Sequence, residues 1–90
     1  MPLDKNLPIL IVDDYKTMLR IIRNLLKQLD FNNIDEATDG SMALDKLKDR
    51  KFGLVISDWN MQPMTGLELL RAVRADAGLK SLPFIMITAE

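Results

Sequence analysis

The stretch PILIVDD, at residues 8–14, decides how the rest of the chain is interpreted. Its first five residues are apolar without alternation, a pattern typical of a strand that is buried on both faces of a parallel sheet. One turn of a buried helix gives the same pattern, so the run is informative only together with the residues after it. Asp13 and Asp14 end the run and begin a different kind of segment.

An amphipathic helix is predicted directly after this strand, over residues 15–29. Apolar side chains recur there at spacings of three and four, and four cations lie on the other side. We expect Asp14 to be the N-cap, and we interpret the basic stripe as a solvated face. The inward-facing side chains are predicted to be Tyr15, Met18, Leu19, Ile22, Leu25, Leu26 and Leu29.

Strands and helices continue to alternate along the rest of the chain. Thr65 is followed three residues later by Glu68, a capping box that marks the start of the third helix. Alternation of this kind predicts a parallel sheet with right-handed crossovers. Beyond the first strand and helix, strands are predicted at 34–37 (an edge), 54–57 and 83–87, and helices at 41–50 and 65–75.

Length and composition restrict the classes of function. The 90 residues allow one domain at most, with a tail at 1–7 and the domain at 8–90. A net charge of −1 gives no argument for a nucleic-acid partner. Without Cys or His, the chain has no disulfides, no thiolate chemistry and no imidazole base. No apolar run approaches the ~20 residues of a membrane span, and no secretory signal is recognisable, so we expect a cytosolic protein.

Polar residues follow three of the predicted strands. Asp13 and Asp14 follow the first strand, Asp58 the third and Thr88 the fourth. Ligands of open α/β sheets bind at the carboxyl ends of the strands. If the first and third strands are neighbours, three carboxylates crowd one small area, where they either raise one another's pKa or require a cation. An oxygen-only set of ligands favours Mg²⁺.

Helix capping is a competing explanation for these aspartates. It suffices for Asp14 alone, but it is weaker for Asp13, Asp14 and Asp58 together. No glycine-rich phosphate loop is present, which argues against a bound nucleotide. A carboxylate can itself accept a phosphoryl group to give an acyl phosphate. Such a transfer depends on positioning and charge neutralisation, so the lack of His is no obstacle if another molecule is the donor.

Five stretches are informative together: ILIVDDYKTM at 9–18, FNNIDEATDG at 31–40, VISDWNM at 55–61, GLELLRAVRAD at 66–76 and ITAE at 87–90. They resemble the receiver domains of two-component response regulators, and more narrowly the chemotaxis branch of CheY-type regulators. The resemblance implies an α/β, flavodoxin-like (CheY-like) fold, a doubly wound parallel sheet with strand order 2-1-3-4. The tripeptide DWN at 58–60 favours chemotaxis over a transcriptional role.

The resemblance also implies a role for each residue of the site. Asp58 would accept the phosphoryl group from a histidine kinase of the CheA type. Asp13, Asp14, Asp58 and the backbone carbonyl of Asn60 would hold Mg²⁺. Thr88 would be the switch hydroxyl that contacts the phosphoryl group. The downstream partner, in the full-length form, would be the flagellar motor switch, and the result would be control of flagellar rotation.

Trp59, next to the implied phosphoacceptor, has two interpretations. It is either a plain exposed loop aromatic or a residue that gates the site. We also interpret the six methionines as core filler rather than a recognition surface.

The chain departs from the family pattern in three places. Asp30 stands where the family often has glycine, at a left-handed turn that costs an ordinary residue about 1 kcal/mol. Gln62-Pro63 places the loop proline one position later than usual. The largest departure is that the chain ends after the fourth strand. It is therefore expected to be a truncated receiver without the fifth strand, the last two helices and the lysine that pairs with the phosphoryl group.

Two other functions are considered. The first is a fragment without output that self-associates through apolar surfaces, giving a homo-oligomer. The second is a phosphohydrolase with an aspartate nucleophile. Such an enzyme usually has a second Asp two residues after the nucleophile, where this chain has Asn60. We therefore expect a phosphoacceptor rather than an enzyme, with any catalysis limited to its own phosphorylation and dephosphorylation.

Overall fold

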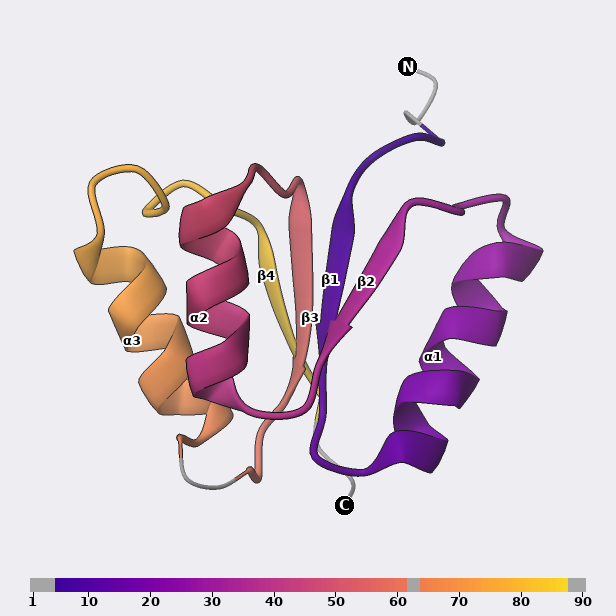
Figure 1. The fold of residues 1–90 in the computed structure, drawn as a ribbon, viewed down its shortest axis with the longest axis horizontal. Coiled ribbons are helices and arrows are strands. Elements are labelled where there is room, and N and C mark those ends of the chain that lie inside the picture. Colours follow the sequence, from indigo (N-terminus) through magenta and orange to yellow (C-terminus); the bar gives the residue numbers. More distant parts are fainter. Residues whose placement is uncertain (1–4, 62–63, 88–90) are drawn as a thin grey trace.

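A computed structural model of the chain describes residues 5–61 and 64–87. Within these residues, a four-stranded parallel sheet has the order β2-β1-β3-β4, which confirms the predicted fold and the edge position of the second strand (Figure 1). The elements are β1 (Ile9–Val12), α1 (Lys16–Gln28), β2 (Ile34–Ala37), α2 (Gly40–Asp49), β3 (Leu54–Asp58), α3 (Gly66–Ala75) and β4 (Phe84–Ile87).

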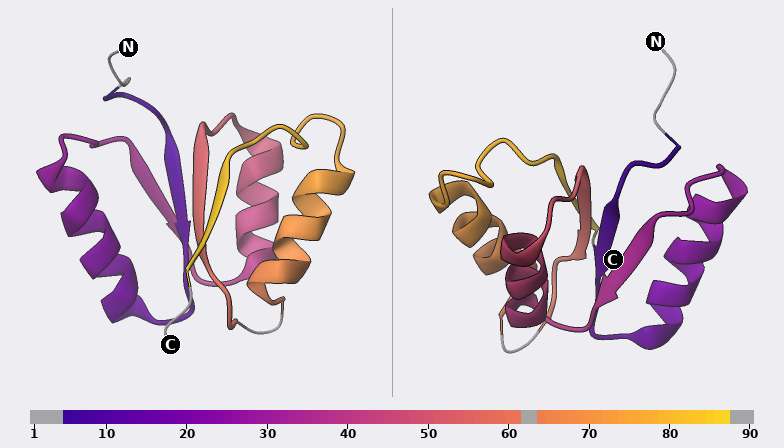
Figure 2. Two further views of the ribbon diagram at one scale, coloured as in Figure 1. Left: turned by 180° about the vertical axis from the view of Figure 1, so that it is seen from behind. Right: turned by 45° about the horizontal axis from the view of Figure 1, so that its top comes forward.

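The helices cover the two faces of the sheet unequally. α2 and α3 lie on one face, and α1 lies alone on the other (Figures 1 and 2). β1 supplies both cores, because Leu10 and Val12 pack toward α2 and α3 while Ile9 and Ile11 pack toward α1. All four side chains are buried. This double burial explains why the first strand is apolar without alternation.

The strand register brings the carboxyl ends of the strands to one edge. Val12, the last residue of β1, is level with Ala37 of β2 and Ser57 of β3. Asp58 in turn is level with Ile87 of β4. The residues that follow β1 and those that end β3 are therefore neighbours, which is the condition for the three carboxylates to meet.

Helix α1 is less buried than its sequence pattern predicts. Leu19 and Ile22 are buried, but Tyr15, Leu25 and Leu29 are 60%, 54% and 58% exposed. The prediction that all seven apolar side chains face inward is thus wrong for these three. With one helix on this face, only the side chains that point directly at the sheet find cover. Self-association through such exposed side chains stays a prediction.

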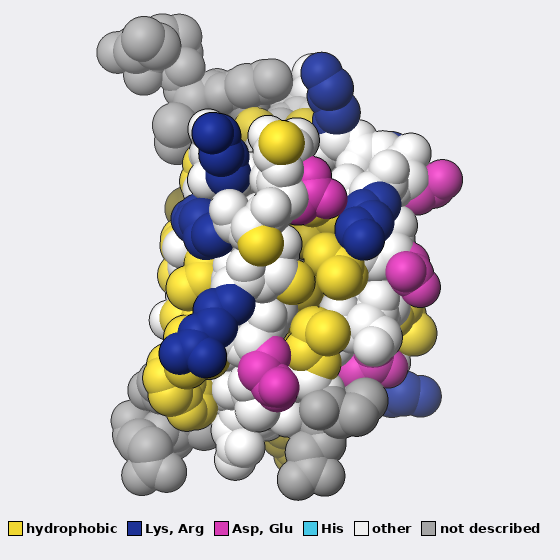
Figure 3. All heavy atoms as spheres, turned by 90° about the vertical axis from the view of Figure 1, so that its left-hand side faces the viewer, with side chains coloured by type: hydrophobic (Ala, Val, Ile, Leu, Met, Phe, Trp, Pro, Cys, Tyr) yellow, Lys and Arg dark blue, Asp and Glu magenta, His cyan; other side chains and the backbone are white. Residues whose placement is uncertain are grey.

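A similar correction applies to α2, on the face that two helices cover. The sequence predicts that Met42 faces inward, but Met42 is 39% exposed, whereas its neighbour Ala43 is fully buried. On the α1 side of the sheet, Ile85 of β4 is half exposed. On the side that carries α3, apolar side chains lie among basic and acidic ones (Figure 3).

The helix ends test the capping predictions. The capping box of Thr65 and Glu68 is present at the start of α3. The predicted cap of α1 is wrong, because its N-cap residue is Tyr15 and no side chain caps it. Asp13 accepts a hydrogen bond from the backbone N–H of Tyr15 instead. Asp30 has a φ of 69°, which confirms the predicted left-handed turn after α1.

Candidate functional site

Three carboxylates meet at the carboxyl edge of the sheet, as the sequence predicts. Asp13 and Asp14 follow β1, and Asp58 ends β3. One carboxylate oxygen from each lies within 4.8 Å of the others. In residues 5–61 and 64–87 no other group of three acidic side chains is this close. The parallel pairing of β1 and β3 is what brings these residues together.

The negative charge of this cluster is not neutralised by cations of the fold. None of the three carboxylates forms an ion pair with a Lys or Arg of the described residues. Asp13 is only 5% exposed. Burial raises the pKa of Asp13, the charges of Asp58 and Asp14 raise it further, and the N–H of Tyr15 opposes the rise. The ionised cluster is therefore held at a free-energy cost that a bound cation would remove.

The donor atoms of the cluster fit a hard divalent cation. Three carboxylates offer oxygen ligands only, on a partly exposed edge where water can complete the coordination shell. Mg²⁺ favours this combination of few carboxylates, water and phosphate. The backbone carbonyl of Asn60, two residues after Asp58, stays a prediction as a further ligand.

Backbone hydrogen bonds fix the segment around Asp58. The N–H of Trp59 donates to the carbonyl of Ile87 in β4 at 2.8 Å. The carbonyl of Trp59 accepts from the N–H of Gly66, the first residue of α3, at 3.0 Å. The hydroxyl of Ser57 donates to the carbonyl of Asp58, also at 3.0 Å. The Asp58 peptide is therefore held between β4 and α3.

The other residues predicted for the site have different outcomes. Trp59 is 47% exposed beside Asp58, which agrees with an exposed loop aromatic, and its gating role stays a prediction. Thr88 lies outside the described residues. Sequence reasoning missed Ser57 and Gly66. The sequence holds one indication of Ser57, because it is a polar residue in a strand that is otherwise apolar up to Asp58. It holds none of Gly66, because the importance of that position depends on how closely α3 approaches β3.

A separate hollow of about 530 Å³ lies at the opposite end of the sheet, between the end of α2 and the loop before β4. Leu47, Phe52, Leu79 and Leu82 form its apolar wall. It is remote from the three aspartates, so it is not part of the acidic site.

Comparison with known proteins identifies the family. The profile of the response regulator receiver domain matches residues 9–90. The chain belongs to the response regulator receiver domain family. It is 57% identical over 88 residues to the chemotaxis protein CheY-3 of Vibrio cholerae, covering 98% of this chain and 68% of that protein. It is 58% identical over 82 residues to the chemotaxis protein CheY of Pseudomonas aeruginosa, covering 91% and 66%.

Solved structures agree with this assignment. The chemotaxis response regulator CheY4 of Vibrio cholerae superposes with a TM-score of 0.86 at 34% identity, over 94% of this chain and 70% of that one. A response regulator receiver protein from Pseudomonas putida has a TM-score of 0.85 at 29% identity, over 96% and 70%. The receiver domain described here thus belongs to two-component signalling and to its CheY-type chemotaxis branch. None of its described helices is long and apolar enough to span a membrane.

Proposed function

We propose that this receiver domain accepts a phosphoryl group on Asp58 from a histidine kinase of the CheA type. The observation that carries the proposal is the cluster of Asp13, Asp14 and Asp58, whose carboxylate oxygens lie within 4.8 Å of one another. The buried Asp13 and its unpaired neighbours concentrate negative charge where a cation and a phosphoryl group would meet. Membership of the receiver family supports the same chemistry.

In the proposed reaction, a carboxylate oxygen of Asp58 attacks the phosphorus atom of a phosphohistidine. The phosphorus–nitrogen bond breaks, its electron pair stays on the imidazole nitrogen, and an acyl phosphate forms on Asp58. Bound Mg²⁺ would neutralise the charge on the phosphoryl oxygens. Asp13 and Asp14 would hold the ion with Asp58 and Asn60, and Thr88 would contact the phosphoryl group.

We place the output of this reaction in flagellar control. The phosphorylated form would bind the flagellar motor switch in the cytoplasm and change the rotation of the flagellum. Support comes from the two chemotaxis relatives, of which this chain spans about two thirds. We propose no turnover of external substrates, and any catalysis would be limited to phosphorylation and dephosphorylation of Asp58.

The test is phosphate incorporation from a small-molecule phosphodonor, followed by intact-protein mass spectrometry with Mg²⁺ present. We expect one phosphate per chain in the wild type and none in Asp58→Asn. Asp45→Asn, a change on the exposed surface of α2, is the matched control and should behave as the wild type. Absence of incorporation in the wild type would overturn the proposal. Steady release of many phosphates per chain would indicate a phosphohydrolase, an activity that Asn60 argues against.

A further inference from the structure

Gly66 packs against the backbone of Asp58. A Cβ added at Gly66 would overlap the carbonyl oxygen of Asp58 and lie 3.1 Å from the carbonyl carbon. It would also lie 2.7 Å from the sulfur of Met86 in β4. Met86 can turn its flexible side chain away, but the Asp58 carbonyl belongs to a strand. A side chain at position 66 therefore requires that either β3 or α3 shift.

This environment is unique among the four glycines of the chain. A Cβ at Gly40 or Gly53 would meet only side-chain atoms, those of Met64 and Leu7 respectively. At Gly78 the nearest atom would be a side-chain oxygen 3.4 Å away, an ordinary contact. Among these glycines, only Gly66 has a backbone group in the space that a Cβ would take. Gly66 also has no positive φ, so the requirement is for space and not for an unusual backbone conformation.

We propose that Gly66 is a positioning residue for the acidic site. Its missing side chain lets the first turn of α3 lie directly on the peptide of Asp58. That contact sets where the Asp58 carboxylate stands relative to Asp13 and Asp14. This inference rests on the proposed function, because it assigns a purpose to the placement of the same carboxylate.

The hydrogen bonds around Asp58 explain why a displacement there would reach the carboxylate. Trp59 is bonded through its N–H to Ile87 and through its carbonyl to Gly66. The N–H of Trp59 shares a peptide group with the Asp58 carbonyl, so moving that carbonyl away from an added methyl group strains the bond to Ile87 of β4. A site of this kind requires its groups to be held within about 0.5 Å, and a misplacement of about 1 Å can reduce a rate about 100-fold.

The test is the Mg²⁺ dissociation constant of Gly66→Ala, followed through the fluorescence of Trp59. We expect it to rise by about tenfold or more relative to the wild type, as is usual when a group that orients metal ligands is disturbed. Thr65→Ala is the matched control, because it breaks the adjacent capping box and weakens α3 without adding an atom near Asp58. Gly78→Ala is the control for the glycine change itself. Both controls should stay within about twofold of the wild type.

A second readout does not depend on bound metal. In the metal-free protein, amide hydrogen exchange at Trp59 should be faster in Gly66→Ala than in Thr65→Ala at matched global stability. Equal exchange and equal Mg²⁺ affinity in the two variants would reduce Gly66 to a helix-stability residue and overturn the proposal. Met86→Ala added to Gly66→Ala should not restore affinity, because it leaves the carbonyl overlap in place. Full restoration of Mg²⁺ affinity in the double variant would also overturn the positioning role of Gly66.

If Gly66→Ala does not fold, Ser57→Ala gives a milder perturbation of the same peptide. It removes the hydroxyl that donates to the Asp58 carbonyl, and we expect Mg²⁺ affinity to fall about threefold. Unchanged affinity would contradict the proposal.

The proposed function and the positioning role of Gly66 can be refuted independently of each other. A wild type that binds Mg²⁺ but takes no phosphate refutes the phosphoacceptor function alone. Normal phosphorylation and Mg²⁺ affinity in Gly66→Ala refute the positioning role alone.

Discussion

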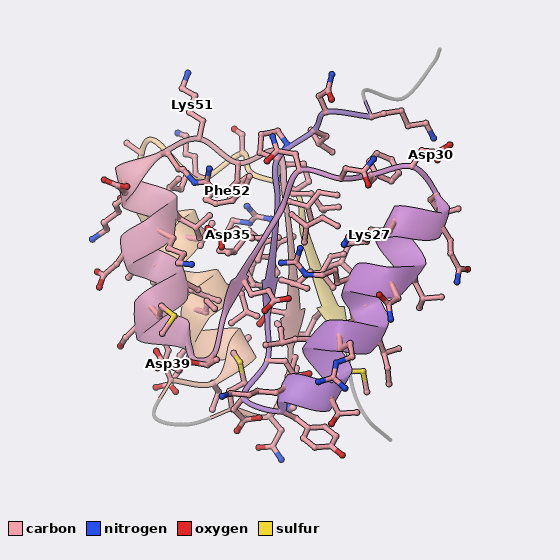
Figure 4. All side chains as sticks on the ribbon, turned by 45° about the vertical axis from the view of Figure 1, so that its right-hand side comes forward. Lys27, Asp30, Asp35, Asp39, Lys51 and Phe52 are labelled. Atoms are coloured by element: carbon pink, nitrogen blue, oxygen red, sulfur yellow. The ribbon has the colours of Figure 1, made fainter. Side chains whose placement is uncertain are left out.

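Asp13 and Asp35 belong to neighbouring parts of the same sheet, yet their surroundings are opposite. Asp35 lies on β2, on the strand's side toward α2 (Figure 4). It accepts hydrogen bonds from Lys46 at 3.0 Å and from Arg50 at 2.9 Å. Burial would raise the pKa of Asp35, but the bonds from Lys46, the Glu36 backbone and Arg50 outweigh it and lower the pKa. Burial raises the pKa of Asp13 too, but there the two neighbouring carboxylates raise it further instead of opposing the rise.

The difference separates a carboxylate that is paired within the fold from one that belongs to the proposed cation site. The charge of Asp35 is neutralised by two cations of α2 and its C-terminal end, and the two ion pairs join that helix to β2. Asp13, Asp14 and Asp58 have no ion pair with a Lys or Arg of residues 5–61 and 64–87, which is why we propose that a cation neutralises them. Residue type does not distinguish the two cases, because both are aspartates at the sheet. Their partners distinguish them.

The largest expected effect is on metal affinity. Asp13→Asn should raise the Mg²⁺ dissociation constant by about 10- to 100-fold, the usual cost of losing a group that supports a metal site. Asp35→Asn should leave it unchanged. Titration of Trp59 fluorescence measures both. Equal losses in the two variants would remove the distinction between the two carboxylates.

The next effect is on the metal-free protein, where the two substitutions should act in opposite directions. Asp13→Asn relieves repulsion from Asp14 and Asp58, and we expect the free energy of unfolding to rise by about 1 kcal/mol. Asp35→Asn removes two partly exposed ion pairs, and we expect it to fall by up to about 1 kcal/mol. Urea denaturation with a chelator present measures both changes. Shifts of the same sign would contradict the account.

The pH dependence of these shifts follows from the directions of the pKa changes. A raised pKa means that folded Asp13 binds its proton more tightly than the unfolded chain does, so stability is lost as pH rises from 3.8 through the raised value. The gain from Asp13→Asn should therefore be full at neutral pH and vanish in acid. Asp35 stabilises above 3.8, and that contribution disappears as pH falls through its lowered pKa. Denaturation curves at neutral and acidic pH test both trends, and a gain from Asp13→Asn that grows in acid would refute the first.

The smallest expected effect is at Glu36, the neighbour of Asp35 on β2. Glu36 forms one ion pair, with Arg23 of α1 at 2.7 Å, and its side chain is 36% exposed. Glu36→Gln should lower the free energy of unfolding by less than about 0.5 kcal/mol, and added salt should reduce the effect. Urea denaturation of Glu36→Gln and Asp35→Asn shows which variant loses more free energy of unfolding. A larger effect at Glu36 would show that pairing with two cations is not what makes Asp35 structural.

Much of the site was predictable because it depends on short segments and parallel pairing. The apolar run before Asp13 and the run before Asp58 each indicated a buried strand, and parallel neighbours must end at the same edge. The features that the sequence did not predict, the start of α1 and the exposure of its apolar side chains, depend on contacts between distant parts of the chain. Asp13 and Asp14 are adjacent, so the sequence offers two candidates for the start of α1. The turn after β1 decides between them, and it is Asp13 that accepts the hydrogen bond from the Tyr15 N–H. The exposure of Leu25 depends on how many helices cover its face of the sheet.

The most direct test of the central claim is the effect of Mg²⁺ on unfolding. If Asp13, Asp14 and Asp58 form a cation site of the native state, Mg²⁺ at 100 times its dissociation constant should raise the free energy of unfolding by about 2.7 kcal/mol. At that same Mg²⁺ concentration, Asp35→Asn should show the full gain, and Asp13→Asn, with its 10- to 100-fold weaker binding, a gain of only about 0.4–1.4 kcal/mol. Absence of a gain in the wild type, or an equal gain in Asp13→Asn, would contradict the account.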